Sequence, residues 1–251
     1  TGSVVDVAGT SAVLDIKNTN RYTPVTVASN AGDVSISARE GMLLDSTLKA
    51  NSPGALGGSL TLRLTRGSSK QSGNPSASPY PGTVADFSST GNAPDQQWYV
   101  DVSQGGTFVP TSLQVGDSLQ SSAGGLAKIS ADNISHAGFS ELALKSEYGL
   151  RFTGDVDLKT NRSIEVNAKI IEATANANVK LTAPNVVLGN VEETNALRPT
   201  NDYSAGTPLA GTGNLIVNSN LLDVKGNVAL SGFASAALNS TGDVRLSGIS
   251  N

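Results

Sequence analysis

A short unit recurs along this 251-residue chain and limits its fold more than any other feature. The unit is a Gly, then Asn or Asp, then Val or Leu, one free position, and another aliphatic residue. Its copies begin at Gly32, Gly154, Gly213, Gly226 and Gly242. The Gly-Asn/Asp pair favours a turn because both residues tolerate positive φ. The alternation of apolar and polar residues that follows predicts a strand with one buried face.

The apolar composition indicates a narrow core. Hydrophobic residues make up 38% of the chain and aromatic residues only 4%, and aromatic side chains are what fill broad cores. The aliphatic residues nevertheless fall at regular positions, which argues against disorder. A core that is one residue wide and many layers long would need this mixture.

Charge and cysteine content exclude several classes of function. The net charge is −4, from 17 basic and 21 acidic residues, without a basic run, so nucleic acid is not expected as a partner. The absence of cysteine excludes disulfides, thiolate metal sites and a cysteine nucleophile. It also suits a secreted bacterial protein that crosses membranes unfolded. No apolar run approaches the roughly 20 residues of a membrane-spanning helix.

The alternating pattern divides the chain into five segments. Residues 1–64, 123–191 and 213–251 carry the pattern and are predicted to form successive coils of one body. Residues 65–122 and 192–212 interrupt it and are predicted to be excursions from that body. The first excursion is rich in Ser, Gly and Pro, and a structureless loop of that length is unusual in a compact domain.

Three local predictions refine this division. The first excursion is expected to end in short strands at Trp98–Val102 and Phe108–Val109. A helix over Ala168–Val179 is conceivable from its Ala and Glu content, but its Asn and Thr residues are poor helix formers, so we reject it. The segment around His136 is predicted to be a corner between strands.

An all-β fold follows, and a parallel β-helix fits it best. A sandwich or barrel would need larger side chains and hairpin turns every 8–12 residues. A parallel β-helix uses aliphatic inward residues with Asn, Asp and Gly at corners that recur in each coil. With roughly 20–25 residues per coil, the patterned segments would give about 7–9 coils and a rod of about 35–45 Å. We expect a monomeric rod.

Two stretches carry a resemblance to a known family. Leu222–Gly248, with its Asp223-Val224-Lys225-Gly226-Asn227 and Gly242-Asp243-Val244 units, resembles large exoproteins of the filamentous-haemagglutinin type, and so does the stretch from Asn30 to Ala38. The resemblance covers most of the chain except the two excursions. It implies a right-handed parallel β-helix that is an internal segment of a longer protein.

The same resemblance implies a function and a location. Members of this family leave the cell through an outer-membrane pore of two-partner secretion systems and serve as adhesins, biofilm matrix proteins or toxin-carrying stalks. A secreted, surface-associated location and a role in cell adhesion, biofilm or virulence are therefore expected. The family supplies no catalytic motif, and no enzyme activity, cofactor or metal is predicted.

Two candidate catalytic features are weak. Asp155 and Asp157 are two residues apart on a predicted strand and so project to one face, as a Ca²⁺ site or an acid/base pair would require. The simpler interpretation is two solvated strand residues beside Lys159. His136 is the sole histidine, and no Gly-x-Ser-x-Gly elbow accompanies it.

The strongest candidate binding site lies in the first excursion. Aromatic and amide side chains are concentrated there, which suits stacking on sugar rings or contact with a surface protein. The predicted ligand-binding residues are Tyr80, Gln96, Gln97, Trp98 and Tyr99. The alternative is a local apolar cluster that ties the excursion to the body. The second excursion, around Tyr203, is a weaker candidate.

Three functions remain open from the sequence. The preferred one is a structural and adhesive segment that binds a glycan or a host or bacterial surface protein through the first excursion. The second is a polysaccharide-cleaving β-helix enzyme, which would need carboxylates clustered in a groove. The third is a passive stalk that only separates distant domains.

Overall fold

The computed structural model describes residues 2–38, 41–64, 99–114, 125–146, 148–190 and 207–248. These residues form strands and one short helix, α2 (Ala131–Ala137), so the prediction of an all-β chain is confirmed. The strands are β1 Val4–Asp6, β2 Ser11–Asn18, β3 Arg21–Ala28, β4 Asp33–Ala38, β5 Gly41–Leu43, β6 Thr47–Lys49, β7 Ser59–Leu64, β8 Tyr99–Ser103, β9 Leu126–Ser130, β10 Glu141–Ser146, β11 Gly149–Thr153, β12 Val156–Lys159, β13 Ser163–Asn167, β14 Ile170–Ala173, β15 Asn178–Thr182, β16 Asn185–Gly189, β17 Gly213–Ser219, β18 Leu221–Lys225, β19 Ala229–Ser231, β20 Phe233–Ser240 and β21 Val244–Ser247.

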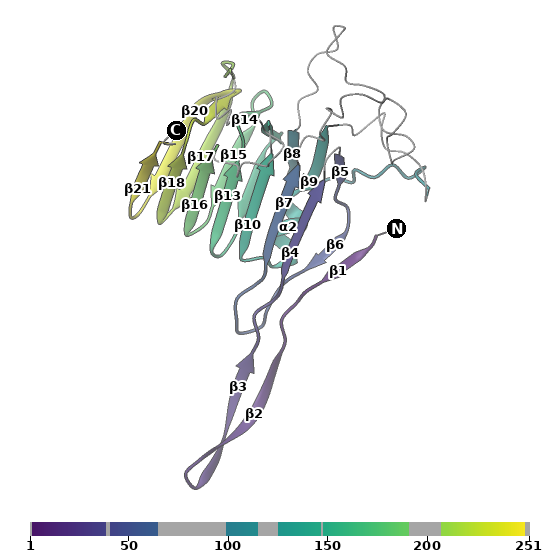
Figure 1. The fold of residues 1–251 in the computed structure, drawn as a ribbon, viewed down its shortest axis with the longest axis vertical. Helices are drawn as coiled ribbons and strands as arrows, with labels where there is room; N and C mark the ends of the chain where they lie inside the picture. The colour runs from purple at the N-terminus through teal and green to yellow at the C-terminus, as the bar shows by residue number, and fades with distance from the viewer. Residues whose placement is uncertain are drawn as a thin grey trace, which may run out of the picture.

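Most strands belong to three parallel sheets (Figure 1). The seven-stranded sheet has the order β21-β18-β16-β13-β10-β7-β4, the six-stranded sheet β19-β14-β11-β8-β9-β5, and the four-stranded sheet β12-β15-β17-β20. A short parallel pair, β1 and β6, lies beside them. Together with α2, these strands are called the body. The predicted parallel pairing is therefore confirmed for the body.

Consecutive strands enter the three sheets in a fixed order, and one passage through all three sheets is called a turn of the body. β10, β11 and β12 belong to the seven-, six- and four-stranded sheets, and β13, β14 and β15 repeat that order, as do β18, β19 and β20. The pairing repeats after 22 residues (163 − 141), because Glu141 lies opposite Ser163 and Ser163 lies opposite Asn185. This step falls inside the expected range of roughly 20–25 residues.

The six-stranded sheet departs from this order twice. Between β7 and β10 the chain contributes two strands to it, β8 and β9, and β9 lies on the side of β8 that faces β5. Between β16 and β17, residues 191–206 are outside the described part of the chain, and β14 pairs directly with β19. The six-stranded sheet is nevertheless continuous. β9 lies between β8 and β5, and β14 pairs directly with β19.

The core lies between the three sheets and is built from aligned aliphatic side chains. In the seven-stranded sheet Leu60, Leu142, Ile164, Val186 and Leu222 stand in one row, each at most 1% exposed. Residues on either side of each of them in sequence point outward, as the alternation predicts. Burial of such rows supplies most of the stabilising free energy, at about 25 cal/mol per Å² of apolar surface.

Helix α2 corrects the corner that was predicted around His136. Ser130 caps its start by accepting a hydrogen bond from Asn133 N, and Gly138 ends it in a left-handed conformation, with φ 82°. The helix packs against β6 and β12, where other turns place a strand of the four-stranded sheet. The backbone joins it to the preceding turn, since Ala50 N donates to Ala137 O at 2.7 Å.

Other local predictions have mixed outcomes. A strand at Trp98–Val102 is confirmed in its described part as β8, which pairs with β9 and β11. Phe108–Val109 is not a strand, because both backbone N–H groups donate to the carboxylate of Asp45, at 2.8 and 2.6 Å from Oδ2. The rejection of a helix over Ala168–Val179 is confirmed, since β14 and β15 occupy this range with a turn between them.

A β-hairpin projects from the body (Figure 1). β2 and β3 pair antiparallel from Ser11 opposite Ala28 to Asn18 opposite Arg21. They belong to the segment that was predicted to form coils of the body, so this part of the prediction differs from the structure. The polar turn at Thr19 and Asn20 is short enough to pair the two strands with each other instead of with a distant strand.

Candidate binding surface

A cluster of aromatic and charged side chains lies on the outer face of the six-stranded sheet. Along β8, Val100 and Val102 are fully buried in the core, so Tyr99 and Asp101 project to the opposite face. Parallel pairing places Arg151 of β11 opposite Asp101 and Glu172 of β14 opposite Arg151. Strands from three different turns therefore build this surface, which we call the Tyr99 cluster (Tyr99, Asp101, Tyr148, Arg151 and Glu172).

The ring of Tyr99 fits over a position that has no side chain. A Cβ atom at Gly149 would lie 2.3 Å from Cε1 of Tyr99, so no other residue is compatible with this ring position. Tyr148 contacts the ring edge-on, with ring centres 5.4 Å apart and planes at 68°. Tyr99, Ile170 and Ala229 form a small apolar cluster outside the main core.

An ion pair holds one side of this ring. Arg151 Nε and Nη2 donate to the two carboxylate oxygens of Asp101 at 2.8 and 2.9 Å. The guanidinium carbon lies 4.9 Å from the centre of the Tyr99 ring, a favourable cation–π position. Hydrogen bonding to Asp101 raises the pKa of Arg151, so this cation is permanent at any physiological pH.

Charges alternate across the sheet at this level. Lys128, Asp101, Arg151 and Glu172 stand opposite one another on β9, β8, β11 and β14. Burial raises the pKa of Tyr99, and the negative charge of Glu172 raises it further. The Tyr99 hydroxyl therefore stays protonated and remains a hydrogen-bond donor.

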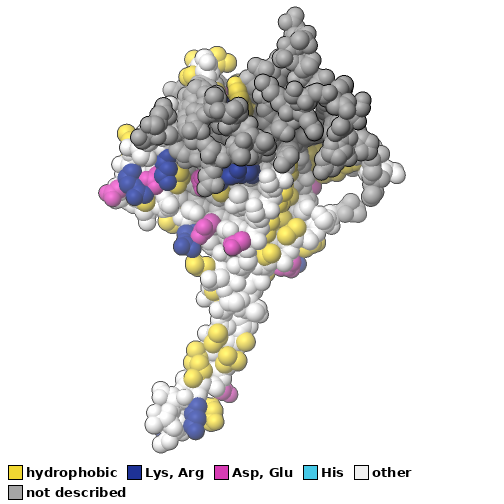
Figure 2. All heavy atoms as spheres, viewed as in Figure 1, with side chains coloured by type: hydrophobic (Ala, Val, Ile, Leu, Met, Phe, Trp, Pro, Cys, Tyr) yellow, Lys and Arg dark blue, Asp and Glu magenta, His cyan; other side chains and the backbone are white. Residues whose placement is uncertain are grey.

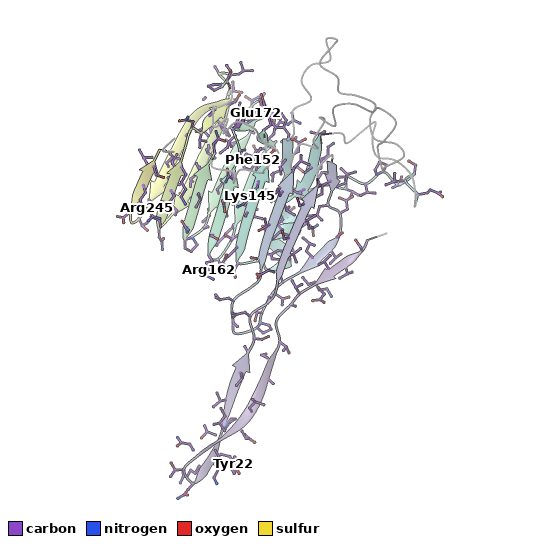
Figure 3. The ribbon with its side chains drawn as sticks, viewed as in Figure 1. Tyr22, Lys145, Phe152, Arg162, Glu172 and Arg245 are labelled. Atoms are coloured by element: carbon purple, nitrogen blue, oxygen red, sulfur yellow. The ribbon has the colours of Figure 1, made fainter. Side chains whose placement is uncertain are left out.

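A shallow hollow adjoins Glu172 at the edge of this surface. Its volume is about 230 Å³, which is smaller than the roughly 300–1,000 Å³ of sites that enclose a small ligand. It is lined by Glu172, Ala173, Ala175, Leu209, Ala210, Gly211, Thr212, Ser231 and Gly232. Figure 3 shows Glu172 near the end of the body that is opposite the hairpin.

The residues that the sequence nominated for binding are only partly described. Tyr80, Gln96, Gln97 and Trp98, like Tyr203, lie outside the described residues. Tyr99 is 8% exposed, so its ring has little surface left for stacking on a sugar. Its observed contacts match the alternative of a local apolar cluster.

The two aspartates and the histidine have simple structural contacts. Asp155 accepts hydrogen bonds from the backbone and side-chain nitrogens of Asn178, at 2.8 and 3.1 Å. Asp157 lies 3.5 Å from Nζ of Lys180. His136 is exposed, and its Nδ1 lies 2.7 Å from the carbonyl oxygen of Asp132. Within the described ranges no three His, Cys, Asp or Glu side chains gather as metal ligands would.

The outer face of the four-stranded sheet carries ladders of amide side chains. Asn214 donates to Asn178 at 3.1 Å, and Ser235 donates to Asn214 at 2.8 Å, which continues the contact between Asn178 and Asp155. Asn178 and Ser235 are exposed and Asn214 is half-buried, so the ladder borders on water. The outward positions of β17 are Asn214, Ile216 and Asn218, so the face combines amide groups with an exposed aliphatic side chain.

The sequence analysis did not nominate Tyr148, Arg151, Asp101 or Glu172. The signal that could have found two of them is the repeat itself, because Arg151 and Glu172 are 21 residues apart (172 − 151) and lie opposite each other. Asp101 could not be aligned in this way, since an additional strand, β9, separates its turn from the regular ones.

Comparisons with protein-family models, with curated proteins and with solved structures found no match. In the part of the chain that the structure describes, no helix has the length and apolar character needed to cross a membrane.

Proposed function

We propose that the chain forms a right-handed parallel β-helix and is a structural and adhesive segment of a large secreted exoprotein of the filamentous-haemagglutinin type. The observation that carries this proposal is the cyclic visit of consecutive strands to three parallel sheets at a step of 22 residues (163 − 141). Such stacking builds length without building a pocket, which suits a rod that displays surfaces.

The chemistry of the outer faces supports binding instead of catalysis. The Tyr99 cluster holds its charges in pairs, and the amide ladders present many weak hydrogen-bonding groups on a flat face. Flat, repetitive polar faces suit extended ligands that make many small contacts. A glycan or a protein on a host or bacterial surface is therefore the proposed partner, with an outer-membrane pore exporting the parent protein.

The first excursion is the proposed contact site, because it includes β8 and so supplies Tyr99 and Asp101 to the Tyr99 cluster. Binding to a broad glycan array and to cultured cells, with the purified chain coated on beads, tests this. The combined substitution of Trp98, Gln96 and Gln97 by Ala should abolish saturable binding. The matched control replaces Asn214, Asn218 and Asn239 by Ala on the four-stranded sheet and should weaken saturable binding without abolishing it, because the amide ladders add only weak contacts.

Each outcome of that experiment has a meaning. If only the control variant loses binding, the amide face is the adhesive surface and the site assignment is wrong. If neither surface binds any glycan or cell, the adhesive part of the proposal fails and the rod is a passive stalk. Shortened glycan products would instead indicate a polysaccharide-cleaving enzyme.

A further inference from the structure

The hairpin has backbone edges that the rest of the described chain leaves open. β2 and β3 form a two-stranded sheet of their own, and no other strand among the described residues pairs with either. Every residue of β2 is exposed, and so is every residue of β3 except Ala28. A lone two-stranded ribbon is marginally stable in water, so its edges and faces are candidates for a contact.

The turn determines which backbone groups face outward. In a hairpin closed by a two-residue turn, the closing pair, here Asn18 and Arg21, is hydrogen-bonded, and bonded pairs alternate with non-bonded pairs. Leu14–Val25 and Ile16–Thr23 are then bonded pairs, and Asp15–Pro24 is not. The lack of an N–H at Pro24 agrees with this phase.

The two outer edges consequently differ. On β3, Pro24 offers no donor at its outward position, which blunts that edge against further pairing. On β2, the outward backbone groups belong to Val13, Asp15 and Lys17, and each has both a donor and an acceptor. β2 is therefore the edge that can accept another strand.

One face of the hairpin is apolar and open to solvent. Leu14 and Ile16 lie on it with Val25 and Val27, and these four side chains are 50%, 47%, 40% and 45% exposed. The opposite face carries Asp15 and Lys17, together with Val13 and Tyr22, which are 66% and 69% exposed. Figure 2 shows hydrophobic side chains along the hairpin and charged ones close to its tip.

We propose that β2 is a self-association edge, to which β2 of a second copy adds antiparallel around a two-fold axis at Ile16. In this register Asp15 lies opposite Lys17 of the second copy, and Lys17 lies opposite its Asp15. These two pairs are hydrogen-bonded through the outward backbone groups, and the two Ile16 side chains meet in the non-bonded pair between them. The result is a four-stranded sheet, β3-β2-β2-β3, with a continuous apolar face.

Charge complementarity favours the Ile16 register over registers centred on nearby residues. An axis at Asp15 would place the two Asp15 carboxylates opposite each other, which is unfavourable. An axis at Leu14 would place Asp15 opposite Val13 and Lys17 opposite Ser11, so neither charge would be matched. The Ile16 register also overlaps the hairpins near their tips, which keeps the two bodies apart.

A lipid surface fits the hairpin less well than a second copy. The unpaired backbone groups on both edges would be left without partners in a hydrocarbon layer. The tip is polar, with Asn18, Thr19 and Asn20 between Lys17 and Arg21. This proposed association differs from the monomeric rod that the sequence predicts, and it is independent of the adhesive function.

Disulfide trapping tests the register directly, because the chain has no cysteine of its own. In the proposed dimer the two Ile16 Cα atoms would be about 4.5 Å apart, within the range that a disulfide spans. The full chain carrying Ile16→Cys should form a covalent dimer under mild oxidation. Leu14→Cys is the matched control, on the same strand and face, and should form no covalent dimer because Leu14 lies opposite Asn18 of the second copy.

Charge reversal provides a second test without cysteine. Asp15→Lys alone or Lys17→Asp alone should weaken dimerisation, measured by sedimentation at several protein concentrations, by about tenfold. The double variant, Asp15→Lys with Lys17→Asp, restores opposite charges and should restore the dimer. Equal trapping through positions 14 and 16, or a double variant as weak as the single ones, would overturn the proposed register.

Two further outcomes would overturn the proposal as a whole. One is a chain that stays monomeric at all concentrations and gives no Ile16→Cys dimer. The other is a hairpin that binds vesicles of neutral and anionic phospholipids, with loss of binding in Ile16→Asp, which would assign the apolar face to a membrane.

Discussion

The body and the hairpin follow the same alternation of apolar and polar residues but use it differently. In the body, Leu60, Leu62 and Leu64 of β7 point into a shared core and are at most 1% exposed. In the hairpin, Leu14 and Ile16 of β2 stand on one face that nothing in the described chain covers. The alternation determines which side chains share a face. The connections between strands determine whether that face is packed against other strands or left exposed.

The connections between strands also determine how far apart in sequence two paired strands lie. A body strand pairs with one that follows after about one full turn of the three sheets, so its stability depends on distant residues. β2 pairs with the next strand in sequence, across a turn of two residues. The body should therefore unfold as a cooperative unit, and the hairpin should open and close locally.

Deletions in the two regions should have opposite consequences, and the larger deletion should be the tolerated one. Deletion of residues 163–173 removes β13 and β14. The chain would then pass from β12 directly to β15, which belongs to the same sheet, without the strands of the other two sheets, so the body should fail to fold. Deletion of residues 11–28 removes the hairpin, and the body should fold normally, because Ser29 N already donates to Thr10 O at 2.8 Å. Circular dichroism and urea unfolding would distinguish the two variants.

A whole-turn deletion is the control for this comparison. Without residues 163–184, Glu141 would lie opposite Asn185, Gly149 opposite Ala229 and Val156 opposite Leu215, all in the present register. This variant should fold with a smaller urea m-value, since it exposes less surface on unfolding. If this variant is unfolded while the variant lacking residues 163–173 is folded, successive turns of the body are not structurally equivalent.

The same substitution should have very different effects in the two regions. Leu144→Ala, at a side chain that is 0% exposed, should lower the free energy of unfolding by about 2–5 kcal/mol through lost burial and a cavity. Leu14→Ala, at a side chain that is 50% exposed, should lower it by less than about 0.5 kcal/mol. Urea titration of both variants measures this difference, and equal losses would mean that the hairpin is part of the cooperative core.

The parallel sheets could be predicted from the sequence because the pattern is strong where the core is regular. The alternation of Leu60, Leu62 and Leu64 predicts a strand. The Gly-Asn/Asp pairs are a weaker signal, because Gly154 and Gly226 have positive φ, as a turn requires, whereas Gly213 and Asn214 lie inside β17. The hairpin could not be predicted in this way, because β2 and β3 carry the same alternation as body strands. Helix α2 has cap signals in Ser130 and Gly138, but its seven residues are too few for a helical period to be visible.

The Tyr99 cluster could be predicted only in part. Tyr99 stands out because aromatic residues are rare in the chain. Its neighbours Tyr148 and Arg151 come from another turn, and their approach depends on which residues lie opposite each other in the sheet. A register shift of one residue would move every side chain to the other face, so the composition of a surface built from several turns follows only from the structure.

Low pH should lower the stability of the body, because an ion pair between two of its strands is lost on protonation. No such ion pair is found among the described contacts of the hairpin. Asp223 of β18 accepts hydrogen bonds from Arg245 of β21, with Nη2 to Oδ2 at 2.6 Å, and this lowers the pKa of Asp223. A carboxyl whose pKa is lower in the folded state contributes stability above its unfolded pKa, about 3.9. That contribution is lost as the pH falls through 3.9 toward the folded value.

Asp223→Asn should therefore be less stable than the parent at pH 7 and should lose less stability between pH 6 and pH 3. Arg245→Met should show the same reduced pH dependence, because it removes the other partner. Urea midpoints of the three proteins at both pH values measure the effect, which we expect to be smaller than that of Leu144→Ala. An unchanged pH dependence in both variants would exclude this pair as its source.

The smallest predicted effect concerns the turn of the hairpin. Thr19 has φ 45°, a left-handed conformation that is strained for a β-branched residue. Thr19→Gly removes about 1–2 kcal/mol of strain and adds about 1 kcal/mol of lost chain entropy, so the hairpin should gain about 0.5 kcal/mol. Amide hydrogen exchange should slow in β2 and β3 and stay the same in the body, whereas Thr23→Gly, inside β3, should speed exchange in the hairpin. If both glycine variants had the same sign of effect, the strain at Thr19 would not be what limits the hairpin.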